Sequence, residues 1–223
     1  MNPHPVQALI FDFDGLIVDT EVPLFEAWQE NYAAYGHDLR LEDYAGCIGT
    51  DFSGWDPKSN LENLTGGPVD WDHWDTERER HAHEKIEQLG PLPGVGELLH
   101  EAEAAGIPCA VASSSSRGWV ERNLHRIGLF EKVKLTRCRD DVSAIKPDPE
   151  LFQTTAEKLG VPPENAVVLE DSLNGLRAAI SAGNPCVVVP NRITAHLEFE
   201  GAAARVSSME EVSVQKLPEW IQR

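Results

Sequence analysis

The sequence is poor in basic residues, in cysteine pairs and in long apolar runs. No apolar run approaches the length of a membrane span, and Met1 to Val6 lacks the basic start and the apolar stretch of a signal peptide. These features favour a soluble, cytoplasmic protein. No Cys-x-x-Cys pair occurs, which is typical of reduced, mostly structural thiols. The four cysteines are Cys47, Cys109, Cys138 and Cys186.

The shortage of positive charge limits the classes of partner. The chain has 19 basic and 37 acidic residues and a formal net charge of −18. Such a charge repels nucleic acid backbones and anionic lipid, so we expect neither nucleic acid nor membrane partners. A phosphorylated small molecule would also be repelled at long range. A phosphate site in this chain would therefore need a local metal ion and a few local cations.

The most informative stretch lies near the start of the chain. Ala8 to Phe11 is a short apolar run closed by Gly15, which is typical of a strand buried on both faces of a parallel sheet. Two carboxylates, Asp12 and Asp14, follow this run, and ligands of open α/β sheets bind outside the carboxyl ends of the strands. The pair indicates a divalent metal with one carboxylate left as nucleophile or acid/base. A capping Asp followed by a turn Asp gives the same pattern.

Further along the chain the pattern changes from strand to helix. Residues 21–35 have the spacing of an amphipathic helix, and residues 39–89 show further helical periods without a segment typical of a buried parallel strand. At 223 residues the chain can hold a core domain with a smaller inserted one. We therefore predict a core domain of residues 1–19 and 91–223 and an all-helical inserted domain of residues 20–90.

From Gly94 onward, apolar and amphipathic segments alternate. The apolar runs predict strands at 107–112, 133–136, 166–169 and 186–189. The amphipathic segments predict helices at 95–105, 117–127, 149–159 and 172–182, each closed by glycine. This alternation predicts an α/β fold with a doubly wound parallel sheet.

More polar groups follow the strands of this second half. Ser113 and Ser114 begin a run of four serines before a predicted helix, whose amino terminus can bind an anion. Lys146 precedes a proline that fixes the backbone, and a lysine there can balance carboxylates and bind a phosphate. Glu170 and Asp171 supply oxygen ligands at the same sheet edge. A serine helix cap, a surface lysine and an acidic helix start are the alternatives to these interpretations.

Four motifs in this order resemble those of the haloacid dehalogenase (HAD) superfamily of aspartate-nucleophile phosphotransferases, in the branch with an inserted helical cap. The resemblance covers nearly the whole chain to about Pro190 and implies a Rossmann-like core domain. The matching residues are Asp12-Phe13-Asp14-Gly15 with Asp19-Thr20-Glu21, Val111-Ala112-Ser113, Lys146-Pro147, and Leu169-Glu170-Asp171-Ser172 with Gly175.

The resemblance implies a catalytic role for several matching residues. Asp12 would be the nucleophile that becomes an aspartyl phosphate, and Asp14 would be the general acid and then the general base. Ser113, the Ser114 backbone and Lys146 would hold the transferring phosphoryl oxygens. Such positioning supplies most of the catalysis in phosphoryl transfer.

The resemblance also implies a bound Mg²⁺. The Asp12 carboxylate, the Asp14 main-chain carbonyl and Asp171 would hold the ion, with Glu170 a further ligand directly or through water. The inserted domain would act as a cap that closes and excludes bulk water.

The aspartate at Asp14 favours a phosphate ester as substrate, because the leaving oxygen of an ester must be protonated. We therefore predict a Mg²⁺-dependent phosphatase that acts on a small phosphorylated metabolite, such as a sugar phosphate or phosphoglycolate. We expect a monomer or a weak homo-oligomer. The cap residues that are candidates to line the substrate pocket are Glu21, Thr50, Asp51, Trp55, Trp74 and Arg78.

Two alternatives stay open. A β-phosphoglucomutase-like enzyme shares several of these motifs, but Leu24 stands where the mutase pattern has a cap histidine. Residues 49–55 also lack the cation expected for a second phosphate, although Arg78 or Arg80 can supply one. A non-catalytic phosphate-binding protein on the same fold would usually lose the nucleophile or a metal carboxylate, and this sequence keeps both.

Overall fold

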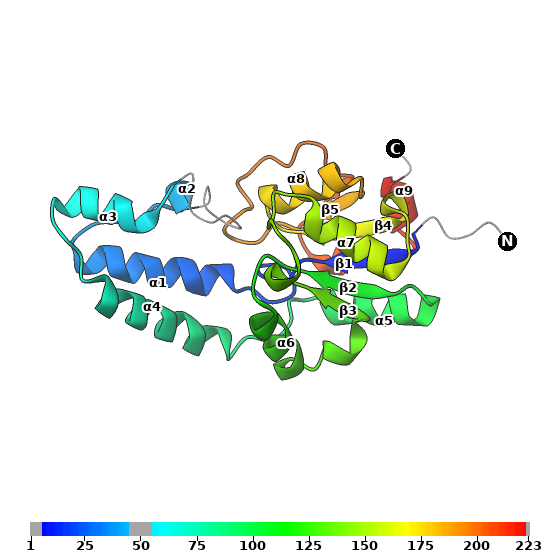
Figure 1. The fold of residues 1–223 in the computed structure, drawn as a ribbon, viewed down its shortest axis with the longest axis horizontal. Coiled ribbons are helices and arrows are strands. Elements are labelled where there is room, and N and C mark those ends of the chain that lie inside the picture. Colours follow the sequence, from blue (N-terminus) through cyan, green and yellow to red (C-terminus); the bar gives the residue numbers. More distant parts are fainter. Residues whose placement is uncertain (1–5, 45–54, 222–223) are drawn as a thin grey trace. The chain divides into compact units, whose positions relative to one another are not determined.

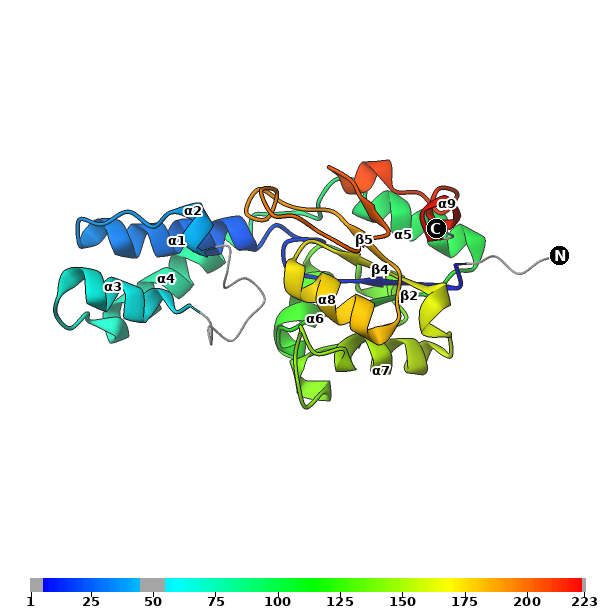
Figure 2. The ribbon, with the colours of Figure 1, turned by 90° about the horizontal axis from the view of Figure 1, so that it is seen from above.

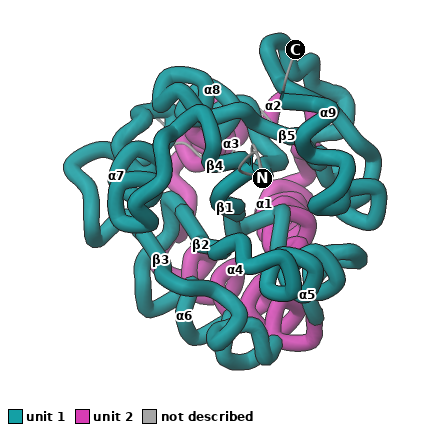
Figure 3. The backbone as a smooth tube through the Cα atoms, turned by 90° about the vertical axis from the view of Figure 1, so that its right-hand side faces the viewer, with its two compact units in different colours: residues 1–18, 90–223 teal, residues 19–89 magenta. Residues whose placement is uncertain are grey.

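The chain divides into two compact units. A computed structural model describes residues 6–44 and 55–221. Unit 1 comprises residues 1–18 and 90–223, and unit 2 comprises residues 19–89 (Figure 3). None of the helices in the described ranges has the length and apolar character that crossing a membrane requires.

Unit 1 is built on one parallel sheet (Figure 1). In the described part of the chain its strands lie in the order β3-β2-β1-β4-β5-β6, and each neighbouring pair is parallel. This order confirms the predicted doubly wound α/β fold. The sequence does not predict β6, because a strand of two residues is too short for a periodic pattern. The strands are β1 (Ala8–Phe11), β2 (Cys109–Ala112), β3 (Leu135–Arg137), β4 (Ala166–Glu170), β5 (Cys186–Val188) and β6 (Ala204–Arg205).

The first strand lies at the centre of this sheet. β1 pairs with β2 on one side and with β4 on the other. All residues of β1 are buried, which explains its continuous apolar run, because a central parallel strand has helices over both faces. The backbone N–H of Asp12 donates to the Leu169 carbonyl at 3.0 Å and so continues the ladder. The first motif therefore leaves the sheet at its centre.

Helices cover both faces of the sheet. α7 (Glu150–Leu159) and α8 (Leu173–Ala182) pack on one face, where Phe152 and Leu176 belong to a buried core with alternate strand residues. α5 (Val95–Ala105) lies on the other face (Figure 2). The predicted helices agree with the observed ones to within one residue at each end. The other α-helices in the described part of this unit are α6 (Arg117–Arg126) and α9 (Leu217–Ile221).

Unit 2 is helical, and its described residues contain no strand. α1 and α4 lie side by side (Figures 1 and 2). The ring of Trp28 in α1 lies edge-on to Trp71 in α4, with 6.2 Å between the ring centroids. Tyr32 donates its hydroxyl proton to the Pro57 carbonyl at 2.8 Å. The helices are α1 (Glu21–Ala34), α2 (Leu41–Tyr44), α3 (Pro57–Thr65) and α4 (Trp71–Ile86).

Candidate active site

Polar residues meet at the carboxyl ends of the three central strands. Asp12 and Asp14 follow β1, Ser113 follows β2, and Glu170 ends β4 with Asp171 after it. Because β1 lies between β2 and β4, the order of the strands alone brings these groups to one edge of the sheet.

Lys146 joins this group from the loop before α7. Its ammonium contacts Asp12 Oδ1 and donates to Glu170 Oε1 at 2.7 Å. The lysine is 3% exposed. Burial lowers the pKa of Lys146, but the two carboxylates outweigh this effect and hold its pKa above the usual value. Lys146 is therefore a buried cation.

The Asp12 carboxyl is also buried. Burial raises the pKa of Asp12 to about 7, the Lys146 ammonium opposes this rise, and the Glu170 and Asp14 carboxylates add to it. A further positive charge beside Asp12 would favour its charged form.

Three carboxyl groups form an acidic cluster, which consists of Asp12, Glu170 and Asp171. Each presents one oxygen, and these oxygens lie within 4.8 Å of one another. All three residues are buried, and Lys146 is the cation that the structure places against two of them. Three buried carboxyl oxygens this close together are the kind of donor set that a hard divalent cation prefers.

Glu170 is held on both of its carboxylate oxygens. Oε1 accepts from Lys146, and Oε2 accepts at 2.9 Å from the N–H groups of Asp171 and Ser172 and from the Ser172 hydroxyl. Gly175 of α8 packs directly on this carboxylate. A Cβ atom at Gly175 would lie 1.7 Å from Oε1. The position of Glu170 therefore depends on the absence of a side chain at Gly175.

Asp171 is oriented by Asn191, which follows β5. The Asn191 amide donates to Asp171 Oδ2 at 2.6 Å and to the Gly15 carbonyl at 3.3 Å. The amide oxygen of Asn191 accepts from the N–H groups of Ile193 at 2.8 Å and Thr194 at 3.2 Å. Asn191 thus connects the acidic cluster to the loop of the first motif.

The side chain of Asp14 has a different set of partners. Its Oδ2 accepts from the Ser115 hydroxyl at 2.7 Å and from the Ser113 hydroxyl at 3.3 Å. Its Oδ1 accepts from the Trp119 indole N–H at 2.9 Å. Asp12 contacts an ammonium, whereas these three donors to Asp14 are neutral. Two neighbouring carboxylates in such different surroundings can take different roles in one reaction.

The model of one protein family, described as haloacid dehalogenase-like hydrolase, matches residues 9–189. The chain belongs to this family. The match confirms the resemblance that the four motifs indicate, and it spans the strands β1 to β5 that carry the acidic cluster.

Individual relatives of this haloacid dehalogenase-like hydrolase match over most of their length. YhcW from Bacillus subtilis is 39% identical over 212 residues, which cover 95% of this chain and 96% of YhcW. A protein from Thermotoga maritima named phosphorylated carbohydrates phosphatase is 32% identical over 182 residues, which cover 80% of this chain and 82% of that protein. The crystal structure of CbbY from Rhodobacter sphaeroides with phosphate has a TM-score of 0.71 and 32% identity, over 92% of this chain and 96% of CbbY.

The structure of this haloacid dehalogenase-like hydrolase brings the predicted core residues to one place. Ser113 contacts Asp14, and Lys146 contacts both Asp12 and Glu170. The hydroxyl of Ser114 is buried and has no hydrogen-bond partner among the described residues.

Three residues at the site are not predicted from the sequence. Ser115 belongs to the run of four serines after β2, and this position at the carboxyl end of a strand could have identified it as a site residue. Trp119 lies one helical turn beyond that run, where an aromatic residue is more typical of packing than of a polar contact. Asn191 bonds to Asp171 from another loop, and no local pattern identifies such a contact.

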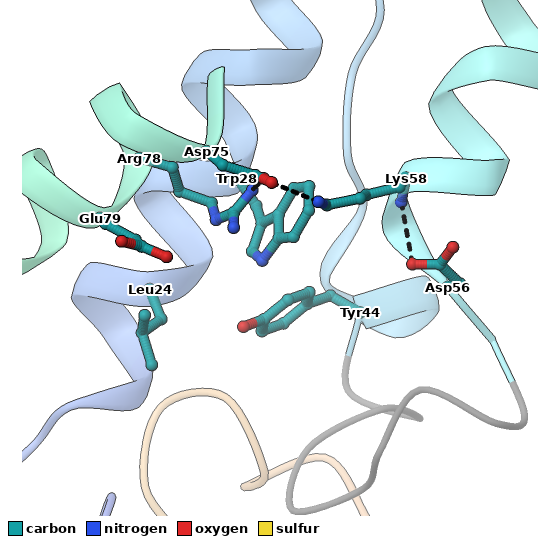
Figure 4. A pocket seen from close by; sticks show the side chains of 8 residues that line it. All are labelled: Leu24, Trp28, Tyr44, Asp56, Lys58, Asp75, Arg78 and Glu79. Carbon is teal, nitrogen blue, oxygen red and sulfur yellow. Dashed lines mark hydrogen bonds and ion pairs between the residues drawn. The ribbon is translucent and has the colours of Figure 1, made fainter. Parts of the chain in front are cut away.

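A pocket of about 720 Å³ lies within unit 2 (Figure 4). Arg78, a predicted cap residue, lies over the Trp28 ring, 3.9 Å from the ring centroid. Arg78 and Lys58 both pair with Asp75, Arg78 at 2.7 Å. The pocket therefore contains an aromatic face, two cations that pair with Asp75, and two further carboxylates, those of Asp56 and Glu79. Its lining residues are Leu24, Trp28, Tyr44, Asp56, Lys58, Asp75, Arg78 and Glu79.

The other predicted cap residues are not in this lining set. Trp74 donates its indole N–H to the Tyr35 hydroxyl at 3.1 Å. Glu21 begins α1, and Trp55 is half-buried ahead of α3. Lys58, which lines the pocket, is not among the predicted cap residues, because a lone lysine in the first turn of a helix has no pattern that marks a pocket. The two cap candidates outside the described residues are Thr50 and Asp51.

Proposed function

We propose that this hydrolase is a Mg²⁺-dependent phosphatase that cleaves a small phosphorylated metabolite through an aspartyl phosphate on Asp12. The observation that carries the proposal is the buried contact of Asp12 with the Lys146 ammonium, within the acidic cluster. A nucleophile beside an ammonium and a cation site can approach a phosphoryl group that the net charge of the chain repels. The phosphorylated carbohydrates phosphatase among the relatives supports a sugar phosphate as substrate.

Asp12 and Asp14 divide the chemistry between them in this proposal. An oxygen of Asp12 bonds to phosphorus as the bond to the leaving oxygen breaks, and Asp14 gives that oxygen its proton. Asp14 then takes a proton from water as the water oxygen bonds to phosphorus and the bond to Asp12 breaks. Inorganic phosphate leaves, and both carboxyl groups return to their starting state.

Other residues hold the phosphoryl group and the metal ion. Lys146, Ser113 and the Ser114 backbone bind the phosphoryl oxygens. The Asp12 and Asp171 carboxylates and the Asp14 carbonyl would hold Mg²⁺, which neutralises phosphoryl charge when bound. Glu170 would contact the Mg²⁺ ion through a water molecule rather than directly, because its carboxylate oxygens already accept from four donors. We propose residues 20–90 as the cap domain that selects the substrate.

Chelation of the metal tests this proposal. Phosphate release from sugar phosphates, phosphoglycolate and nucleotides should fall by about 100-fold or more with a chelator, because phosphoryl charge is then neutralised by Lys146 alone. Added Mg²⁺ should restore the rate. Equal release with and without the chelator would contradict the Mg²⁺ dependence, and no release on the whole panel would contradict the phosphatase.

Asn191→Ala should weaken Mg²⁺ binding by about 10- to 100-fold, because the amide that orients Asp171 is lost. Titration calorimetry with Mg²⁺ measures this without substrate. His196→Ala, an exposed change in the same loop, is the matched control and should bind Mg²⁺ like the unmodified protein. Unchanged affinity in Asn191→Ala would show that metal binding does not depend on the hydrogen bond from Asn191 to Asp171.

One observation favours a phosphosugar mutase as the second candidate. The pocket of unit 2 presents Arg78 and Lys58, which are cations of the kind that a second phosphate requires. Transfer of phosphate between two hydroxyls of a hexose, with a bisphosphate primer and without net phosphate release, would replace the phosphatase by the mutase.

A further inference from the structure

Trp119 has a polar contact that packing alone does not require. It lies in the first turn of α6, where its backbone N–H donates to the capping Ser116 hydroxyl at 3.4 Å. This cap places the indole beside the serine loop at the end of β2. The indole N–H donates to Asp14 Oδ1 at 2.9 Å. An indole has one donor and no acceptor, so the direction of this bond is certain.

Both the ring and the backbone of Trp119 have contacts within α6. The Arg122 guanidinium lies over it, 5.6 Å from the ring centroid. The Asn123 amide donates to the Trp119 carbonyl at 3.0 Å, which stiffens the same turn of helix. These contacts favour one orientation of the indole, in which its N–H points at Asp14.

Two further donors to Asp14 are hydroxyl groups. Ser113 and Ser115 bond to Oδ2 through hydroxyls, which rotate and can donate to another acceptor. Ser113 is also a proposed ligand of the phosphoryl group, so its bond to Asp14 is exchanged when substrate arrives. The Trp119 indole is not a proposed ligand of the phosphoryl group, so substrate binding does not compete for its N–H.

We infer that Trp119 is a positioning residue for Asp14: the indole N–H of Trp119 holds Oδ1 and thereby fixes the orientation of the Asp14 carboxyl group. This inference rests on the proposed function, in which Asp14 protonates the leaving oxygen. The other carboxyl oxygen, Oδ2, faces Ser113 and Ser115, on the side where the phosphoryl group would bind.

A comparison of two substrates with different leaving groups tests the positioning role of Trp119. Trp119→Phe keeps a ring of similar shape and removes the donor. We expect kcat/KM for the fastest sugar phosphate of the panel to fall by about 10- to 100-fold, because an alkoxide must be protonated as it leaves. For p-nitrophenyl phosphate, whose leaving group departs without a proton, kcat/KM should fall by less than about 3-fold. kcat/KM reports the steps up to departure of the leaving group.

The ratio of the two losses separates positioning from folding. Partial misfolding of Trp119→Phe lowers both rates by the same factor and leaves the ratio unchanged. Trp119→His keeps a ring N–H and should recover part of the loss on the sugar phosphate. Trp220→Phe, the same change in α9, should leave both rates unchanged. Equal losses on both substrates, or no loss on either, would overturn the inference. Failure of the unmodified enzyme on both substrates would instead overturn the proposed function and, with it, the inference.

Discussion

Asp12→Asn should abolish phosphate release, with a loss of about four orders of magnitude or more. An amide cannot attack phosphorus to form an acyl phosphate, and the replacement also removes a negative charge from the acidic cluster. Rapid acid quench with substrate labelled in the phosphoryl group measures the intermediate directly. The unmodified enzyme should retain label covalently, and Asp12→Asn should retain none.

The same variant should fold at least as well as the unmodified protein when no metal is present. The pKa of Asp12 rises from 3.8 to about 7 on folding, so the folded state binds this proton more tightly than the unfolded state. Asp12 therefore contributes stability at low pH that is lost as the pH rises toward 7. Asparagine does not ionise, so the variant does not lose this stability as the pH rises. Lys146 still has Glu170 as its partner in the variant. The Tm of Asp12→Asn at pH 8 without metal should thus equal or exceed that of the unmodified protein.

Asp38→Asn is the matched control, because Asp38 is exposed and lies outside the acidic cluster. The rate of phosphate release by Asp38→Asn should stay within about 2-fold of the rate of the unmodified enzyme, as for most surface substitutions. Covalent label that persists in Asp12→Asn would assign the nucleophile to another residue.

Gly175→Ala should both destabilise unit 1 and disable the site. The added Cβ would lie 1.7 Å from Glu170 Oε1, so Glu170 must move from its place beside Lys146. We expect a loss of about 2 to 4 kcal/mol in the free energy of unfolding, as for strained or overpacked cores. Phosphate release should fall by about 100-fold, because Lys146 then loses one of the carboxylates that orient it. Urea unfolding and steady-state rates measure the two effects.

Gly96→Ala provides the control for the change of residue type. Gly96 also lies in a helix, α5, but a Cβ there meets nothing within 4 Å. Ala is favoured over Gly in helices, so Gly96→Ala should raise the free energy of unfolding by up to about 1 kcal/mol and leave the rate unchanged. A similar gain in stability for Gly175→Ala would show that Glu170 is free to move without cost.

The position of the first motif could be predicted because its signals are local. The apolar run of β1 and the two aspartates after it follow one another directly, and a buried strand needs such a run. The same holds for Ser113 after β2 and Glu170 at the end of β4. Because β1, β2 and β4 are parallel neighbours, their carboxyl ends lie at one edge of the sheet, and the residues that follow them lie there together.

The contacts that orient these residues could not be predicted in the same way. Trp119 and Asp14 are 105 positions apart, and Asn191 and Gly15 are 176 apart. Neither pair has a spacing that a helix or a strand imposes. Gly175 illustrates the same limit. The sequence shows that a glycine stands at this position of the motif, but only the structure shows that the Glu170 carboxylate occupies the place where a Cβ atom would lie.

The sequence alone determined the α/β fold, the helical insertion and the chemical groups at the sheet edge, because each follows from patterns within a few residues. Only the tertiary structure decided how those groups are held. It separated Asp14, bonded to Trp119, from Asp12, bonded to Lys146, although the two aspartates are near neighbours in the chain. The physical reason is that hydrogen-bond partners and burial are set by elements that are distant in sequence, and these surroundings assign different roles to identical side chains.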